Sequence, residues 1–424
     1  MNIARRFFPG QSYAFVVVGV IFLSLLAAAG LRATPGVLIL PLEKAFGWER
    51  DTISLAAAIG IFLYGLMGPF AAALMQSFGI KRTLLCALVL MSFSTWLSGF
   101  MTESWHLMAT WGVMSGVASG CVALVMGATV VNRWFVSHRG LIMGILTAST
   151  ATGTLVFLPG LAAIAEGYGW QPVVWTVSAC AAALIPLVWW LLPERPADMD
   201  MIPYGADPNA PPVQAAAVNP LVLAFGALSR ASRKTDFWLL FATFWICGFT
   251  TNGLIGTHLI SFCGDMGIVE VKAAGLLALM GIFDLIGTTG SGWLTDRYDP
   301  RKLLFMYYGL RGISLIYLPY TDFSLYSLSI FAVFYGLDWI ATVPPTVKLA
   351  VEAFGDRDGP IVFGWIAAGH QLGAASAAYF AGYVRTEQGS YFDAFIIAGI
   401  TGVVAAVLAL LIRGKKGSTA FVAA

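Results

Sequence analysis

Hydrophobic residues occur along this chain in long, nearly uninterrupted runs, and short polar segments separate each run from the next. About twelve runs are present, each of about 20 residues or more, the length that an α-helix needs to cross a bilayer. The runs do not alternate as barrel strands do, so the pattern predicts an all-α polytopic membrane protein with about twelve transmembrane helices. We expect spans near residues 13–42, 51–75, 82–100, 105–132, 139–165, 170–193, 236–263, 271–295, 302–320, 323–350, 359–385 and 390–412.

Composition and charge agree with a chain that lies mostly in the lipid bilayer. Hydrophobic residues make up 58% of the 424 residues and charged residues 11%, whereas about a quarter of an average soluble domain is charged. Most Lys and Arg lie on the side that holds the N-terminus, so the positive-inside rule predicts that both termini are cytoplasmic. The net charge of +2 gives no reason to expect nucleic acid, and the five scattered cysteines lack metal-ligand spacing. We expect neither a metal nor a cofactor.

The second half of the sequence repeats the first at a fixed offset of roughly 220 residues. The offset aligns Gly36 with Gly256, Lys81-Arg82 with Arg301-Lys302, Gly116 with Gly336, and Gly153 with Gly373. The fold class is therefore two six-helix pseudo-repeats, with an N-terminal bundle at residues 1–193 and a C-terminal bundle at 236–424. Residues 194–235 form a predicted cytoplasmic linker, rich in Pro, Asp and Ala as far as residue 219, and 220–233 could form a short surface helix.

Five ionisable side chains lie deep within the predicted spans. A rise of about 1.5 Å per residue places each of them about 16–18 Å from the membrane surface, near the level where carriers with internal repeats bind solute. Charged groups at this depth are costly and are functional candidates by default. The five are Arg32, Asp284, Arg311, Asp338 and His370.

Arg32 is the first candidate for binding an anionic substrate. A midplane arginine costs at least about 3 kcal/mol, so it requires a water-filled cavity, a partner or a bound anion. The following Thr34-Pro35-Gly36 supports a cavity, because Pro and Gly loosen a helix and free backbone groups. The alternative is a structural ion pair with a carboxylate of another helix.

Two carboxylates are candidates for proton coupling, Asp284 and Asp338. Burial favours the protonated form of a carboxyl and a nearby cation favours the ionised form, so the charge of either group can follow its surroundings. Either could instead be a fixed partner of an arginine. We expect Arg311 to form a structural pair with a carboxylate such as Asp338. His370 is a candidate substrate contact through hydrogen bonding or protonation, and the alternative is a hydrogen-bond donor that serves only packing.

Neutral side chains complete the expected substrate site: Asn252, Tyr64 and Gln371. Asn252 is the repeat equivalent of Arg32, and Tyr64 that of Asp284, so pseudosymmetry predicts matching positions around a cavity. Charged residues of short turns between helices are expected to gate the cytoplasmic face or to stabilise it. These are Asp296, Arg297, Arg301 and Arg139.

Three stretches resemble bacterial major facilitator superfamily transporters related to monocarboxylate transporters and oxalate/formate antiporters. They are Arg32-Ala-Thr-Pro-Gly36-Val, Arg133-Trp134-Phe135 with Arg139-Gly140 and Gly144, and Phe283-Asp284-Leu285. Gly292 to Lys302 also resembles the loop between the second and third helices of each half of that superfamily. The resemblance implies a substrate role for Arg32, a coupling role for Asp284, and a multi-pass protein of the bacterial inner (plasma) membrane that works as a monomer.

The chain also departs from these relatives. Thr288 stands where the family has an arginine for the substrate carboxylate, and we count it as a candidate substrate contact. His370 stands where oxalate carriers have lysine, and Gln76 replaces the loop aspartate. Fewer fixed positive charges favour a monovalent organic anion, so we expect a proton-coupled secondary transporter of a small monocarboxylate that works by alternating access.

Two other functions stay open from the sequence. One is an exporter of drugs or amphipathic metabolites, and the other is a non-transporting receptor with a carrier fold. The sequence has no nucleotide-binding loop of the Walker type and no catalytic or metal-ligand constellation at helical spacing, so we expect neither an ATP-driven pump nor an enzyme.

Overall fold

A computed structural model of the protein describes residues 10–206 and 220–413. Part of the predicted linker, residues 207–219, therefore lies outside the described residues. Within them the chain is helical, and its one β-type pairing is an isolated bridge between Phe135 and Tyr204. The all-α prediction is confirmed.

Twelve membrane segments follow one another, and each coincides with one of the predicted spans. The first three are α2 (Tyr13–Phe46), α3 (Arg50–Ser77) and α4 (Ile80–Ser98). The fourth is divided into α5 (Ser104–Leu107), η2 (Met108–Met114), α6 (Ser115–Cys121) and α7 (Leu124–Trp134). The fifth and sixth are α8 (Arg139–Tyr168) and α9 (Trp170–Leu191). Short turns join them, as expected for neighbouring antiparallel helices.

The last six segments begin with α11 (Thr235–Gly248), η4 (Phe249–Ile255) and α12 (Gly256–Asp265), which form one span. They continue with α13 (Glu270–Arg297), α14 (Pro300–Tyr317), then α15 (Leu325–Asp338) together with the first part of α16 (Val343–Gln388) as one span, the second part of α16, and α17 (Phe392–Leu410). Gly355, with φ of 82°, breaks α16 into two helices, a conformation that favours glycine. Among the described residues, 10 stretches are long and apolar enough to cross a membrane by composition alone, and α14 and the second part of α16 complete the set.

The sequence repeat corresponds to a repeat of helix contacts. A Cβ on Gly116 would lie 2.8 Å from the carbonyl oxygen of Gly60, and one on Gly336 would lie 2.6 Å from that of Met280, at equivalent positions of the second half. Gly153 and its equivalent Gly373 likewise pack directly on the backbone of α2 and α11. Small residues allow this close approach of lipid-embedded helices, and the same packing has been used twice.

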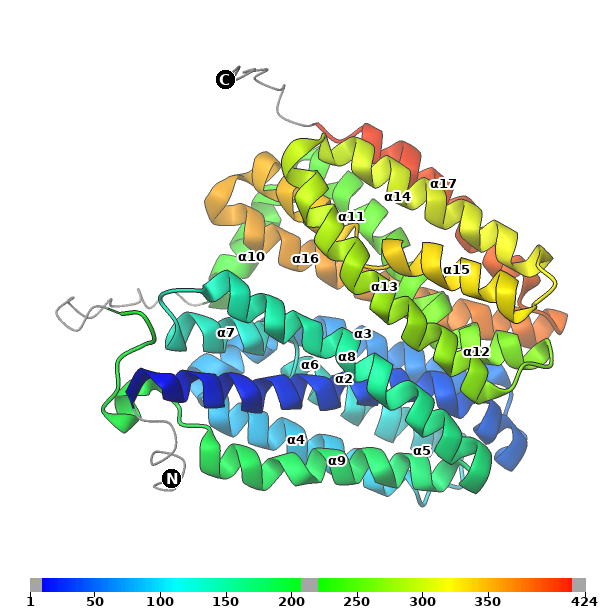
Figure 1. Ribbon diagram of the computed structural model, residues 1–424, viewed down its shortest axis with the longest axis horizontal. Helices are drawn as coiled ribbons and strands as arrows, with labels where there is room; N and C mark the ends of the chain where they lie inside the picture. Colours follow the sequence, from blue (N-terminus) through cyan, green and yellow to red (C-terminus); the bar gives the residue numbers. More distant parts are fainter. Residues whose placement is uncertain (1–9, 207–219, 414–424) are drawn as a thin grey trace.

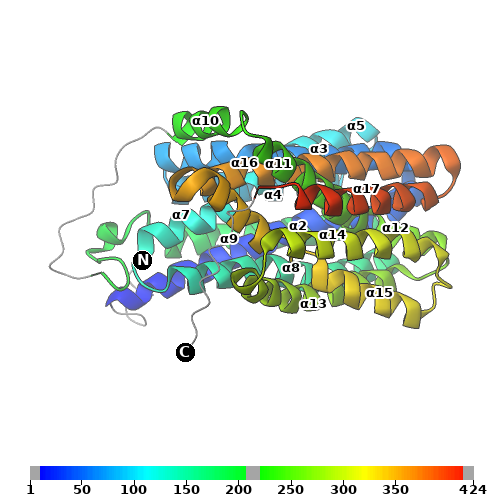
Figure 2. The same cartoon turned by 90° about the horizontal axis from the view of Figure 1, so that it is seen from above.

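The two halves lie side by side along their length (Figure 1). The interface is made by α3 against α16, α8 against α13, and α2 against α12. We call the end that holds residues 194–206 the linker end, and the opposite end, where α2 turns into α3, the distal end. The short helix α10 (Pro220–Ala231) lies at the linker end beside α16, as Figure 2 shows.

Candidate functional site

The centre of the molecule is organised by a close crossing of α2 and α12, the equivalent helices of the two halves. A Cβ on Gly36 would lie 2.9 Å from the carbonyl oxygen of Gly256, so the crossing leaves no room for a side chain. Arg32 and Asn252 each precede these glycines by one helical turn, on the side of the linker end. Residues one turn apart share a helix face, so both side chains belong to the interface just below the crossing.

On the N-terminal side of this space, Arg32 lies over the ring of Tyr64 with 4.6 Å between the guanidinium carbon and the ring centroid. Arg32 is half-buried, and no carboxylate of the described residues lies within 4.0 Å of it. Gln371 of α16 packs against Gly65 of α3, where an added Cβ on the glycine would lie 2.8 Å from the Cγ of Gln371. Arg32 and Tyr64 are therefore in contact, and Gln371 packs on the same helix as Tyr64, one residue further along; among the described residues the guanidinium has a π partner but no anion.

On the C-terminal side, Asn252 lies in the π-helical segment Phe249–Ile255, and π-helical turns often occur at functional sites. The Nε1 of Trp339 donates a hydrogen bond to Oδ1 of Asn252 at 3.4 Å. Sequence reasoning missed Trp339. Its position directly after Asp338 was the available signal, because an aromatic amphipathic side chain beside a buried charge is a plausible cavity residue.

Asp284 is buried, and one of its oxygens is held by two donors. Its Oδ1 accepts hydrogen bonds from the hydroxyl of Thr288 at 3.0 Å and from the backbone nitrogen of Ile340 at 2.8 Å. Because α15 ends at Asp338, the nitrogen of Ile340 is not needed for the bonding of that helix. The carboxylate therefore ties α13 to the turn that carries Trp339, and the hydroxyl of Thr288 points at Asp284.

Arg311 and Asp338 form a buried ion pair, with 2.7 Å between Nε of Arg311 and Oδ2 of Asp338. The guanidinium also donates to the Sγ of Cys247 at 3.0 Å and to the carbonyl oxygens of Asp338 and Trp339. The arginine is 1% exposed. Oδ1 of Asp338 is buried and has no hydrogen-bond partner in the described part of the chain.

His370 belongs to α16 and packs against α11, with its ring centroid 4.9 Å from that of Phe244 and its side chain beside Cys247. Of the five ionisable groups, the structure brings His370, Arg311 and Asp338 into one cluster within the C-terminal half. Asp284 lies beside the turn that follows Asp338, and Arg32 contacts Tyr64 instead. Helix rise gives the depth of a residue but not the side of the helix on which it lies, which explains the difference.

The repeat equivalents of the C-terminal cluster are all uncharged. Cys247, Arg311, Asp338 and His370 correspond to Ala27, Met91, Ala118 and Thr150. The N-terminal half folds into the same six-helix arrangement without any of these charges. Packing of the fold therefore does not require them.

At the distal end, ion pairs join the two halves. Arg50, at the start of α3, is 5% exposed and binds Asp265, at the end of α12, through two hydrogen bonds of 2.8 and 2.7 Å. It also contacts Glu43 at 2.8 Å and the hydroxyl of Tyr391 at 3.4 Å, while Arg385 binds Asp265 at 2.7 Å. We call these five residues the distal lock. Sequence reasoning singled out none of these five residues.

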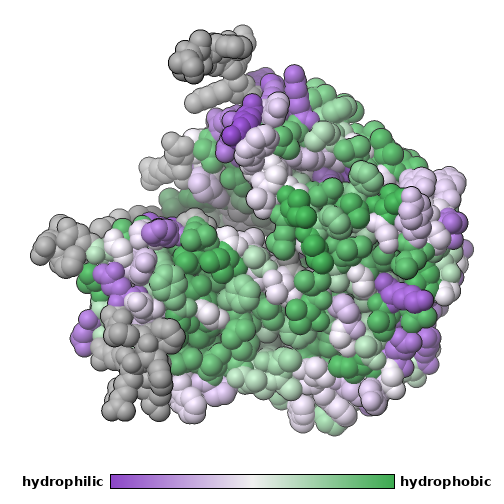
Figure 3. All heavy atoms as spheres, viewed as in Figure 1, coloured by the Kyte–Doolittle hydropathy of each residue, from purple (hydrophilic) through white to green (hydrophobic). Residues whose placement is uncertain are grey.

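At the linker end, no ion pair among the described residues joins the two halves. The four predicted gating residues each contact their own half or are exposed. Asp296 is exposed, and the guanidinium of Arg297 lies 4.1 Å from the ring centroid of Trp293. Arg301 pairs with Asp299 of its own turn at 2.6 Å, and Arg139 donates a hydrogen bond to the carbonyl oxygen of Phe135 at 2.6 Å. The space-filling view shows a recess between the halves at this end, and a largely hydrophobic surface beyond it (Figure 3). Among the described residues, the ion pairs that join the two halves therefore lie at the distal end.

The molecule consists of two bundles of six helices with largely apolar surfaces. Equivalent helices of the two bundles cross closely, and half-buried polar groups lie between them. These features are typical of a polytopic membrane carrier. The family model of the Major Facilitator Superfamily matches residues 20–347, and the chain belongs to this family. It is a transporter and not an enzyme.

Relatives support the same assignment at low identity. Monocarboxylate transporter 13 of Rattus norvegicus is 25% identical over 92% of this chain and 87% of its own length. The uncharacterized MFS-type transporter YcxA of Bacillus subtilis (strain 168) is 26% identical over 74% of each chain. A crystal structure of a bacterial homologue of the human lysosomal transporter Spinster, in an inward-facing and unoccupied conformation, has the same fold, with a TM-score of 0.76 at 15% identity over 94% of this chain and 97% of that chain.

Proposed function

We propose that this transporter moves a small organic anion, a monocarboxylate, across the bacterial inner membrane by alternating access, with coupling to protons. The observation that carries the proposal is Arg32, a half-buried cation between the halves that has no carboxylate partner among the described residues. A cation at this depth is stabilised by a bound anion. The names of several relatives, such as monocarboxylate transporter 13, support an acid as the solute.

One cation with neutral neighbours suits a solute of one negative charge. In the proposed complex, the guanidinium of Arg32 binds the carboxylate, and Tyr64, Gln371 and Asn252 contact the rest of the solute through hydrogen bonds. Trp339 closes the C-terminal side through its contact with Asn252. His370 and Thr288 are proposed as secondary contacts, because each already has a neighbour within the C-terminal half.

Asp284 is the proposed proton carrier, and Asp338 the second. When ionised, Asp284 accepts from the nitrogen of Ile340 and holds the turn that bears Trp339. Protonation weakens this bond, because a neutral carboxyl is a poorer acceptor than a carboxylate. The turn and Trp339 can then move, which changes the contact of Trp339 with Asn252 at the solute site.

The access cycle follows from the ends of the molecule. With the linker end in the cytoplasm, as the positive-inside rule predicts, the distal lock closes the outer side and the present form is open inward. The Spinster homologue with the same fold was solved inward-facing, which supports this assignment. In the outward-open form, the turns at Lys81-Arg82 and Asp296 to Lys302 approach each other and replace the distal lock.

The test is uptake of radiolabelled lactate, pyruvate and other carboxylates into proteoliposomes, with and without an inward proton gradient. We expect gradient-driven uptake of one acid, its loss in Arg32→Gln, and no change in Lys272→Gln, which removes an exposed cation at the distal end. In Asp284→Asn, exchange of solute should persist while the gradient ceases to drive uptake. If no acid moves under any gradient, the proposal is overturned, and efflux of larger amphipathic solutes becomes the function to test.

A further inference from the structure

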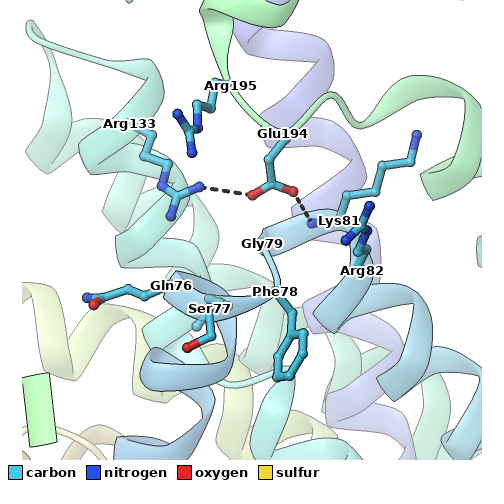
Figure 4. A pocket seen from close by; sticks show the side chains of 10 residues that line it. Gln76, Ser77, Phe78, Gly79, Lys81, Arg82, Arg133, Glu194 and Arg195 are labelled. Carbon is cyan, nitrogen blue, oxygen red and sulfur yellow. Dashed lines mark hydrogen bonds and ion pairs between the residues drawn. The ribbon is translucent and has the colours of Figure 1, made fainter. Parts of the chain in front are cut away.

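A pocket of about 430 Å³ lies at the linker end of the N-terminal half, away from the proposed solute site. It is formed by the α3–α4 turn, the end of α7 and the first residues after α9. Four cationic side chains and one carboxylate line it: Lys81, Arg82, Arg133, Arg195 and Glu194 (Figure 4).

The carboxylate of Glu194 is fully engaged in holding the pocket together. It accepts from the backbone nitrogens of Ile80 at 2.5 Å and Lys81 at 3.0 Å, and so caps the start of α4. It also binds Arg133 at 3.0 Å. One negative charge is thus shared between a helix terminus and one arginine, which leaves the other cations of the pocket without compensation.

Those other cations lack acidic partners in the described part of the chain. The Nζ of Lys81 donates to the carbonyl of Trp189 at 2.6 Å and keeps two free donors. Arg82 and Arg195 are exposed, and neither side chain lies within 4.0 Å of a carboxylate among the described residues. An anion is therefore the ligand that the pocket is suited to bind.

The same turn in the C-terminal half is differently charged. There, Asp296 and Asp299 stand where the N-terminal half has Gln76 and Gly79, while both basic residues are retained as Arg301 and Lys302. Arg301 binds Asp299, and its hydrogen bonds hold the pKa of that carboxyl below its usual value. The C-terminal turn thus pairs one of its cations with an acid of its own, and the N-terminal turn has neither acid.

The surroundings of the pocket place it at the boundary between lipid and water. Trp189 and Phe78 next to it are each 60% exposed, and Trp190 is 65% exposed. Lys81 lies over the ring of Trp189 at 5.3 Å. Exposed tryptophans gather at the level of lipid headgroups, and basic pockets at that level bind anionic lipids.

We propose that this pocket binds the phosphate headgroup of an anionic membrane phospholipid, with Arg82 and Arg195 as direct ligands and Lys81 beside them. The aromatic side chains next to the pocket favour a lipid over a free anion, because they would pack against the acyl chains. The site is independent of the transported solute.

The test uses the purified full-length protein in an uncharged detergent. Binding of dioctanoyl phosphatidylglycerol, dioctanoyl phosphatidylcholine and inorganic phosphate is titrated by native mass spectrometry. We expect saturable binding of phosphatidylglycerol alone, and binding weaker by about tenfold or more in the double variant R82Q/R195Q, since two interfacial cations are removed. The matched control is Lys302→Gln, the repeat equivalent of Arg82, which should bind as wild type does.

A second variant protects the test against misfolding. Gln76→Asp restores the missing acid at an exposed position and should also weaken binding. Equal binding of phosphatidylcholine, displacement by inorganic phosphate at the same concentration as the lipid, or wild-type binding in both R82Q/R195Q and Gln76→Asp would each overturn the proposal. Loss of acid transport would not affect it, so the two proposals fail separately.

Discussion

Substitution of Arg50 by methionine should release the distal end. Arg50 is 5% exposed and contacts Asp265, Glu43 and Tyr391 in the present form. Removing one partner of a buried, hydrogen-bonded charge pair costs about 2–5 kcal/mol. Because Arg385 still binds Asp265 at 2.7 Å, we take the lower part of this range, about 2–3 kcal/mol. In the outward-open form these carboxylates are hydrated, so the cost falls on the closed form alone.

This cost predicts a shift of the equilibrium towards outward-open by about 30- to 150-fold. The matched control is Lys44→Met. Lys44 also reaches across the halves, to Glu270, but at 3.7 Å and with a side chain that is 76% exposed. Such a pair is worth at most about 1 kcal/mol, so the control should shift the equilibrium less than about fivefold.

The shift can be measured by labelling a single cysteine at Ser54, in a background with the five native cysteines replaced by serine. Ser54 is fully buried and lies against Gly382 of α16, where a Cβ would lie 2.6 Å from the Cβ of the serine. A membrane-impermeant maleimide added outside should react when the distal ends part, so its rate reports the open fraction. Equal rates in Arg50→Met and Lys44→Met would refute the reasoning.

Two further predictions concern buried contacts. Arg311→Met leaves the carboxylate of Asp338 buried without its cation, so it should lower the free energy of unfolding by about 3–5 kcal/mol, measured as a lower melting temperature in detergent. The double variant R311M/D338L should recover part of this stability. If it recovers none, Arg311 and Asp338 do not act as a pair. Gly36→Ala places a methyl group 2.9 Å from the carbonyl oxygen of Gly256 and should slow uptake in proteoliposomes. The control is Gly19→Ala, whose methyl group has no neighbouring atom within 4 Å and should leave the uptake rate unchanged. Equal uptake rates in the two variants would contradict the close crossing of α2 and α12.

The sequence was sufficient for the architecture because lipid imposes strong constraints on it. Each apolar run must become a helix, and the offset between the halves pairs residues that make equivalent contacts, such as Gly116 on Gly60 and Gly336 on Met280. Similarly, Arg32 and Asp284 were identified as candidates because a charge in hydrocarbon is conspicuous.

The sequence was insufficient for the side of the helix on which each group lies. Helix rise predicts similar depths for Arg311 and Arg32, yet one is enclosed by its own half and the other lies in the interface. The distal lock was missed for a related reason. Arg50 directly precedes the predicted span 51–75, where a charge is ordinary, and only the folded chain places it beside Asp265, more than two hundred residues away in sequence.

The distribution of charge between the halves constrains how coupling can work. The N-terminal half contributes Arg32, and its equivalents of Arg311 and Asp338 are Met91 and Ala118, so the groups proposed to exchange protons lie in the C-terminal half alone. A proton there can affect a solute at Arg32 only through contacts that cross the interface or act on the solute itself. The bond from Trp339 to Asn252 lies next to the turn that Asp284 holds, and we propose it as this route, because Asn252 is a proposed contact of the solute. Because linkage is reciprocal, this proposal predicts that bound solute alters the proton affinity of Asp284 by the same factor by which protonation alters solute affinity.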